Sequence, residues 1–181
     1  MKTLSLLFGT ALVFGSTTAG RAQGCCSPSG ATGHAGHGGT TASAPAKTTA
    51  PKLALNGVAK PVFENYLAAQ ASLAGDSLET IPTSASTLAR AVRADTGKTF
   101  PAEVASEAEA LAKAKDLAAA RKAFRSLSES LIRFAKAGSI PAGTLYEVHC
   151  PMAKAGWLQA DKTVRNPYFG QAMLSCGQIK G

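Results

Sequence analysis

The sequence has few aromatic residues, no clustered basic residues and no hydrophobic run long enough to cross a membrane. Aromatic residues make up 6% of the chain, with one Trp, so we expect a core built mainly from Leu, Val and Ala. The formal net charge is +8, from 19 Lys and Arg against 11 Asp and Glu, but these cations are spread along the chain. Since nucleic-acid binding needs a concentrated basic face, we expect no nucleic-acid partner.

Signatures of catalysis are also missing from the sequence. No acid/base pair, nucleophile–base pair or phosphate-binding loop can be recognised, so we predict that the protein is not an enzyme. A chain of 181 residues that is 45% hydrophobic and 17% charged can form one domain with tails. The informative residues are the 4 Cys, 3 His and 3 Met, most of which fall into two groups.

Residues 1–22 have the order of a secretory signal: a positive start, an apolar run over residues 4–14, and then small residues. The apolar run is shorter than the roughly 20 residues that span a bilayer. Cleavage fits either after Ala22 or after Gly24. We therefore expect an exported, periplasmic protein with no transmembrane segment once the signal is removed. A lipid anchor at Cys25, which gives an outer-envelope lipoprotein, is the alternative that we favour less.

Residues 23–54 are rich in Gly, Ser, Thr, Ala and Pro and nearly lack large apolar side chains. Such a segment cannot bury enough apolar surface to offset its ordering entropy, so we expect a disordered tail. Thiolate and imidazole groups are ligands for soft and borderline metals. The tail therefore offers a secondary metal site, or simply polar residues in a linker, at Cys25, Cys26, His34 and His37.

Residues 55–181 have helical periodicity followed by a motif-rich end. Apolar residues recur at three and four positions and predict helices over 57–75, 82–93, from Pro101 onwards, and over 117–134. Asp116 either caps the last helix or interrupts a longer one, so the last two stretches are separate helices or one bent helix. We expect an all-α fold: a small antiparallel bundle of three to four helices with a C-terminal motif-rich loop or short β-hairpin region.

The C-terminal motif, residues 144–180, holds two compact clusters with the patterns His-Cys-x-Met and Met-x-x-Cys. Their members are His149, Cys150, Met152, Met173 and Cys176. Thiolate, thioether and imidazole form a soft ligand set, which suits Cu(I) or Ag(I) better than hard cations. Zn(II) is a poorer match, since structural zinc sites use Cys and His without Met.

Two other interpretations of the same cysteines stay open. In an oxidising compartment, Cys150 and Cys176 can form a disulfide that staples the C-terminal segment, with Met152 and Met173 as apolar filler. The loop-entropy model gives such a bond roughly 3 kcal/mol of stabilisation. A thiol redox site is less favoured because the spacing is not C-x-x-C. An oxidised pair binds no metal, whereas a reduced pair can.

Several motifs resemble the bacterial periplasmic domain-of-unknown-function family 3347, over roughly residues 56–180. The resemblance rests on Cys150-Pro151-Met152-Ala153, Trp157-Leu158, Asn166-Pro167-Tyr168-Phe169-Gly170, Met173 and Cys176-Gly177, and on Asp116, Arg121, Phe124 and Leu127-Ser128 before them. Members also occur attached to adaptors of heavy-metal efflux systems. The resemblance thus implies a helical envelope domain linked to copper handling, with Cys150, Met152, Met173 and Cys176 as the shared site positions.

Two classes of function follow from these observations. The first is an exported soft-metal-binding protein: a copper or silver chaperone, sink or efflux accessory. The second is a non-metal envelope interaction module, stapled by a Cys150–Cys176 disulfide, that docks on an efflux adaptor or another envelope protein. Its expected interaction surface consists of Trp157, Asn166, Tyr168 and Phe169. This chain lacks the β-rich adaptor domains themselves, which argues against a direct structural role in a pump.

Overall fold

A computed structural model describes residues 55–180 of the chain. The expected signal at residues 1–22 lies outside the described residues. So does the whole of the expected tail, residues 23–54, with Cys25, Cys26, His34 and His37. Within the described part, no helix has both the length and the apolar character that a membrane span requires.

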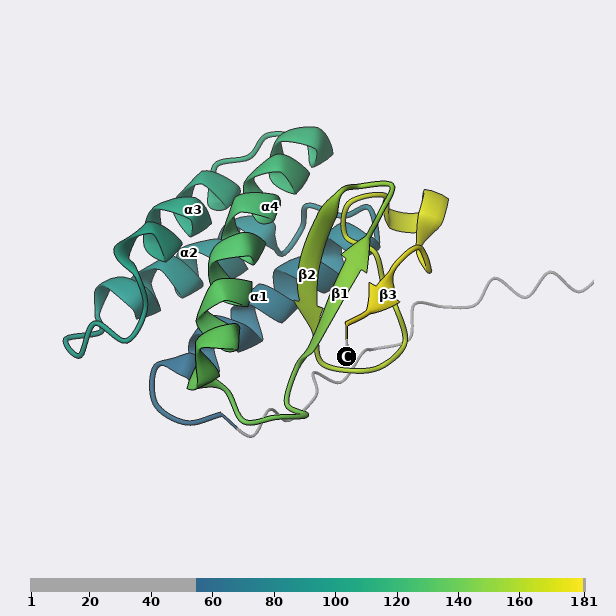
Figure 1. Cartoon of the computed structure of the whole chain (residues 1–181). Coiled ribbons are helices and arrows are strands. Elements are labelled where there is room, and N and C mark those ends of the chain that lie inside the picture. Colours follow the sequence, from purple (N-terminus) through teal and green to yellow (C-terminus); the bar gives the residue numbers. More distant parts are fainter. Residues whose placement is uncertain (1–54, 181) are drawn as a thin grey trace, which may run out of the picture. The chain divides into compact units, whose positions relative to one another are not determined.

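Four helices make up most of the described chain and pack against one another in sequence order, α1 on α2, α2 on α3 and α3 on α4 (Figure 1). Their bounds are Ala59–Ala74 for α1, Ile81–Arg93 for α2, Ala102–Ala112 for α3 and Leu117–Phe134 for α4. The side chains that give α4 its periodicity, such as Phe124, Leu127 and Leu131, are fully buried. The helical part of the predicted fold is therefore confirmed.

Asp116 separates α3 from α4. Its backbone is extended, and its Oδ1 accepts a hydrogen bond from the Ala119 N–H at 2.8 Å, which is the geometry of a helix N-cap. The alternative of one bent helix is therefore wrong. At its other end, α4 continues into a π-helical turn, η1 (Ala135–Ser139). The chain leaves this turn through Gly138, whose φ of 81° is readily adopted only by glycine.

A three-stranded antiparallel sheet follows the helices, so the fold is not purely all-α. Strands β1 (Tyr146–Cys150) and β2 (Ala155–Gln159) form the expected hairpin, with Val148 opposite Trp157 and Cys150 opposite Ala155. A third strand, β3 (Gln178–Ile179), pairs with the other edge of β1. This strand is too short for sequence periodicity to reveal it. The hairpin lies beside α4, with β2 in contact with the helix (Figure 1).

Tyr66 connects the sheet to the helices. Its ring is fully buried in the core and stacks on Phe124 of α4, with 5.0 Å between the ring centroids. Its hydroxyl shares a hydrogen bond of 2.8 Å with the Ser128 hydroxyl and accepts the backbone N–H of Leu158 at 3.1 Å. Burial raises the pKa of Tyr66 above its usual range, so the hydroxyl stays protonated. One side chain thus joins α1, α4 and β2.

We predict that Tyr66→Phe lowers the free energy of unfolding by about 1–3 kcal/mol, because it leaves the buried Leu158 N–H without a partner. Denaturant titration of the variant measures the change. Tyr146→Phe is the matched control, since it removes the same atom from a half-buried tyrosine and should change stability by less than about 0.5 kcal/mol. Equal losses in both variants would contradict the role given to the Tyr66 hydroxyl.

Candidate functional site: a pair of thiols

Two cysteines that are far apart in the sequence meet at the end of the hairpin. Cys150 is the last residue of β1 and is fully buried, while Cys176 follows the short helical turn η2 (Gly170–Met173) and is half-buried. Their sulfur atoms lie 3.1 Å apart, and both are free thiols. This separation exceeds the roughly 2.05 Å of a disulfide. It falls short of the roughly 3.8–4.6 Å expected for two thiolates on one ion with metal–sulfur distances of about 2.3 Å.

Close packing at Gly177 keeps Cys176 against the sheet. A Cβ atom at this position would come within 2.7 Å of the Trp157 ring and 2.8 Å of Val148 Cγ1, so any larger residue would push the segment away. Val148 and Trp157 face each other across the hairpin, on the same face of the sheet as Cys150. The segment that carries Cys176 therefore covers the face that carries Cys150.

The surroundings of the two thiols shift their pKa values in opposite directions. Burial acts to raise the pKa of Cys150, but hydrogen bonds to its sulfur from Cys176, from the backbone of Ala153 and Met152, and from Asn166 outweigh it and lower the pKa. Ala153 N–H lies 3.4 Å from this sulfur. The hydrogen bond to Cys150, together with burial, raises the pKa of Cys176. Cys150 is thus the thiol that ionises first.

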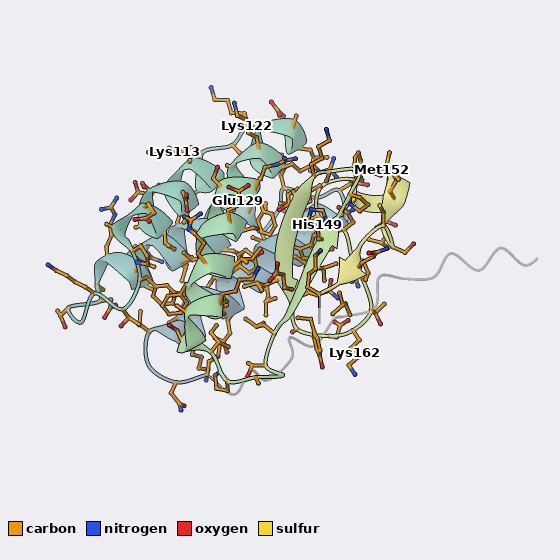
Figure 2. The ribbon with its side chains drawn as sticks, viewed as in Figure 1. Lys113, Lys122, Glu129, His149, Met152 and Lys162 are labelled. Atoms are coloured by element: carbon orange, nitrogen blue, oxygen red, sulfur yellow. The ribbon has the colours of Figure 1, made fainter. Side chains whose placement is uncertain are left out.

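The two methionines of the motif flank the thiol pair and are accessible. Met152 lies in the turn between β1 and β2 and is 64% exposed (Figure 2), and Met173 ends η2 and is 36% exposed. The Cys176 N–H donates to the Met173 carbonyl at 3.0 Å, so Met173 stands one turn before the thiol. The two thioethers are therefore open to solvent and do not fill the core.

His149 lies apart from the thiol pair. Side chains alternate along a strand, so His149 lies on the opposite face of β1 from its neighbours Val148 and Cys150. Its strand neighbours are Gly156 on β2 and Gln178 on β3. The expected cluster therefore contains Cys150 and Cys176, with Met152 and Met173 on the flanking turns, and not His149.

The expected aromatic interaction surface is largely interior, which corrects the prediction. Trp157 and Asn166 are fully buried, and Tyr168 is 8% exposed. Trp157 and Tyr168 meet edge to face at 5.9 Å, and burial raises the pKa of Tyr168 to about 12. Only Phe169 is half-buried; it lines a hollow of about 370 Å³ together with Arg121, Lys122, Arg125 and Met152. The accessible surface next to the thiols is therefore basic rather than aromatic.

The described residues contain no group of three or more His, Cys, Asp or Glu side chains placed to hold a metal ion. The thiol pair therefore supplies two ligands, and a third or fourth would come from a thioether or from outside the described residues. Two thiolates with a thioether suit a soft monovalent ion, which accepts few ligands, better than Zn(II) with its four.

Two contributors to the site were not found by sequence reasoning. The backbone N–H of Ala153 bonds the Cys150 sulfur, and Asn166 bonds the Cys176 carbonyl at 2.7 Å. A signal for the first was present, since Pro151 after a strand indicates a tight turn whose N–H groups point inward. For Asn166, the Asn-Pro pair indicated a turn, but nothing in the sequence indicated burial beside the thiols.

Residues 62–143 match the model of a family described as Protein of unknown function (DUF3347). The match spans the helical part of the domain, from α1 to the residues after η1, and supports the resemblance to that family there. It ends before β1, so the motifs around Cys150 and Cys176 lie outside it. No curated protein and no solved structure matches the chain.

We predict that Cys176→Ala raises the pKa of Cys150, because the buried thiolate loses the hydrogen bond from its neighbour while the cost of burial remains. The Cβ chemical shift of Cys150, followed through a pH titration of the reduced protein, reports this pKa directly. Met173→Ala is the control, since it changes the same segment without removing a donor. An unshifted titration in Cys176→Ala would show that the two sulfur atoms do not share a proton.

Proposed function

We propose that the protein is an exported soft-metal-binding protein that handles copper or silver as a chaperone, a sink or an accessory of metal efflux. The observation that supports this proposal is the approach of Cys150 and Cys176 to 3.1 Å, with Met152 and Met173 on the two flanking turns. Sulfur ligands in this number suit Cu(I) or Ag(I). The protein then acts by binding, and no catalytic step is required.

The surroundings of Cys150 assist metal uptake. Metal binding requires thiolates, and each thiol that is still protonated must release its proton. The hydrogen bonds that lower the pKa of Cys150 make its proton easier to release. Cys176 has the raised pKa and releases its proton second, and its half-exposed position lets the ion reach the pair.

The movement that metal binding requires is small. The sulfur atoms must separate by roughly 0.7–1.5 Å to hold one ion between them. Cys150 is fixed in the core, so the movement falls on Cys176 and the short segment around it. An exposed thioether from Met152 or Met173 can then complete a three-coordinate site and contact a partner that delivers or receives the ion.

A disulfide staple is the second candidate, and the same short distance favours it. The sulfur atoms need to approach by roughly 1 Å to form the bond, and export to an oxidising compartment would promote it. The interaction surface that accompanied this interpretation would have to change, because Trp157, Asn166 and Tyr168 are buried. Docking on an efflux adaptor or another envelope protein would instead use the basic hollow beside Met152.

We predict that the reduced mature protein binds Cu(I) stoichiometrically and that Cys150→Ser with Cys176→Ser abolishes this binding. Competition against a chromogenic Cu(I) chelator measures the affinity. The matched control is Cys25→Ser with Cys26→Ser, which makes the same chemical change in the tail. Undiminished affinity in the Cys150/Cys176 variant would overturn the assignment of the site, and loss in the control alone would move the site to the tail.

Metal specificity and oxidation state decide between the two candidates. We expect the reduced protein to take up Cu(I) and Ag(I) in preference to Zn(II), both with and without residues 23–52, as measured by metal analysis after desalting. Mass analysis under non-reducing conditions reports the disulfide. A Cys150–Cys176 bond that resists reduction would favour the staple over metal handling.

A further inference from the structure

A buried carboxamide organises the loop that brings Cys176 to Cys150. Asn166 is fully buried. Its Oδ1 accepts the backbone N–H groups of Tyr168 at 2.8 Å and Phe169 at 3.2 Å. The backbone N–H of Asn166 donates to the Leu174 carbonyl at 2.7 Å, and its backbone carbonyl accepts from the Gly170 N–H at 3.1 Å. These four bonds fold residues 166–174 back on themselves and make Asn166 the fixed point of the loop.

The side-chain amide of Asn166 faces the thiol pair. Its Nδ2 donates to the Cys176 carbonyl at 2.7 Å, which fixes the backbone from which the Cys176 thiol projects. The thiol on that backbone has its sulfur 3.1 Å from the Cys150 sulfur. One buried amide group thus ties the backbone of Cys176 to the loop that Asn166 organises.

We propose that Asn166 is a positioning residue for the thiol pair: its buried amide holds the backbone of Cys176, so that the Cys176 sulfur stays within reach of the Cys150 sulfur. The proposal rests on the proposed function, which it extends from the ligands to the group that supports them. Groups that hydrogen-bond to metal ligands orient them and tune their charge, and their loss typically weakens metal binding by about 10–100-fold.

A purely structural role of Asn166 can be separated from the proposed positioning role. The same loop is also held by hydrogen bonds of Gln171 that do not contact the thiols. Gln171 donates from Nε2 to the Ala74 carbonyl at 2.9 Å, and its backbone N–H donates to Asp76 Oδ2 at 3.0 Å. Both bonds fasten η2 to the end of α1. Gln171→Ala removes the side-chain bond to Ala74, keeps the backbone bond to Asp76, and leaves the amide group of Asn166 in place.

The test compares Asn166→Asp with Gln171→Ala in the full mature protein. Aspartate keeps the oxygen that accepts from Tyr168 and Phe169, but at neutral pH it has no N–H to donate to the Cys176 carbonyl. We expect Asn166→Asp to lower the Cu(I) affinity by about 10–100-fold. It should also disfavour the Cys150–Cys176 disulfide in a redox titration against glutathione, because the two thiols are no longer held together. Gln171→Ala should leave both values unchanged while its melting temperature falls.

Two results would overturn the proposal: an unchanged disulfide equilibrium and Cu(I) affinity in Asn166→Asp, or an equal change in Gln171→Ala. If Asn166→Asp does not fold, the wild-type protein decides. The side-chain amide protons of Asn166 should then be protected from exchange with solvent by their bond to the Cys176 carbonyl, and rapid exchange would exclude that bond. A wild-type protein that binds neither Cu(I) nor Ag(I) would remove the proposed function, whereas the glutathione titration would still decide the role of Asn166.

Discussion

The placement of the sheet depends on the hydroxyl of Tyr66. This group accepts the outward-facing N–H of Leu158, and the Tyr168 hydroxyl donates to the outward-facing carbonyl of Gly156, so two tyrosines satisfy the free edge of β2. An uncovered strand edge invites pairing with another chain. Here the edge is instead bonded to the helical core, through Ser128 as well. These bonds fix the position of the hairpin, and with it that of Cys150, relative to the helices.

A second set of contacts fixes the segment that carries Cys176. Arg121 of α4 forms an ion pair with Asp76 and donates to the Pro167 carbonyl at 3.0 Å, while Asp76 also accepts the N–H of Gln171. The hydrogen bonds from Gln171 and Arg121 lower the pKa of Asp76. Gly170 has a φ of 57° and would meet the Asp76 carboxylate if it carried a side chain. The thiol pair thus results from two separate anchors, one for each cysteine.

The sequence predicted the helices well because their apolar residues repeat with the helical period over long stretches, and Asp116 stands where a cap is needed. Tyr146 and Val148 alternate with polar neighbours, which favours the short strand found as β1. Burial of Trp157 could not be predicted in this way, because nearly every residue of β2 is buried and the strand shows no alternation. Asn166 lies in an irregular segment, which has no period that separates buried from exposed positions. The alternation that predicted β1 also separates His149 from Cys150, and this consequence could have been drawn from the sequence. The sequence alone does not reveal the long-range hydrogen bonds that bring Cys150 and Cys176 together.

The unequal environments of the two thiols imply how an ion would enter the proposed site. The buried Cys150 thiol has the lowered pKa and the half-exposed Cys176 thiol the raised pKa, so Cys150 releases its proton first. A metal ion that arrives from the solvent side would then replace the proton that remains on Cys176. The two sulfur atoms must also move slightly apart, and the part that moves is the segment around Cys176, whose carbonyl Asn166 holds. An oxidant acting on the same pair would instead bring the sulfur atoms together. Metal binding and disulfide formation therefore exclude each other, because they require different distances between the two sulfur atoms.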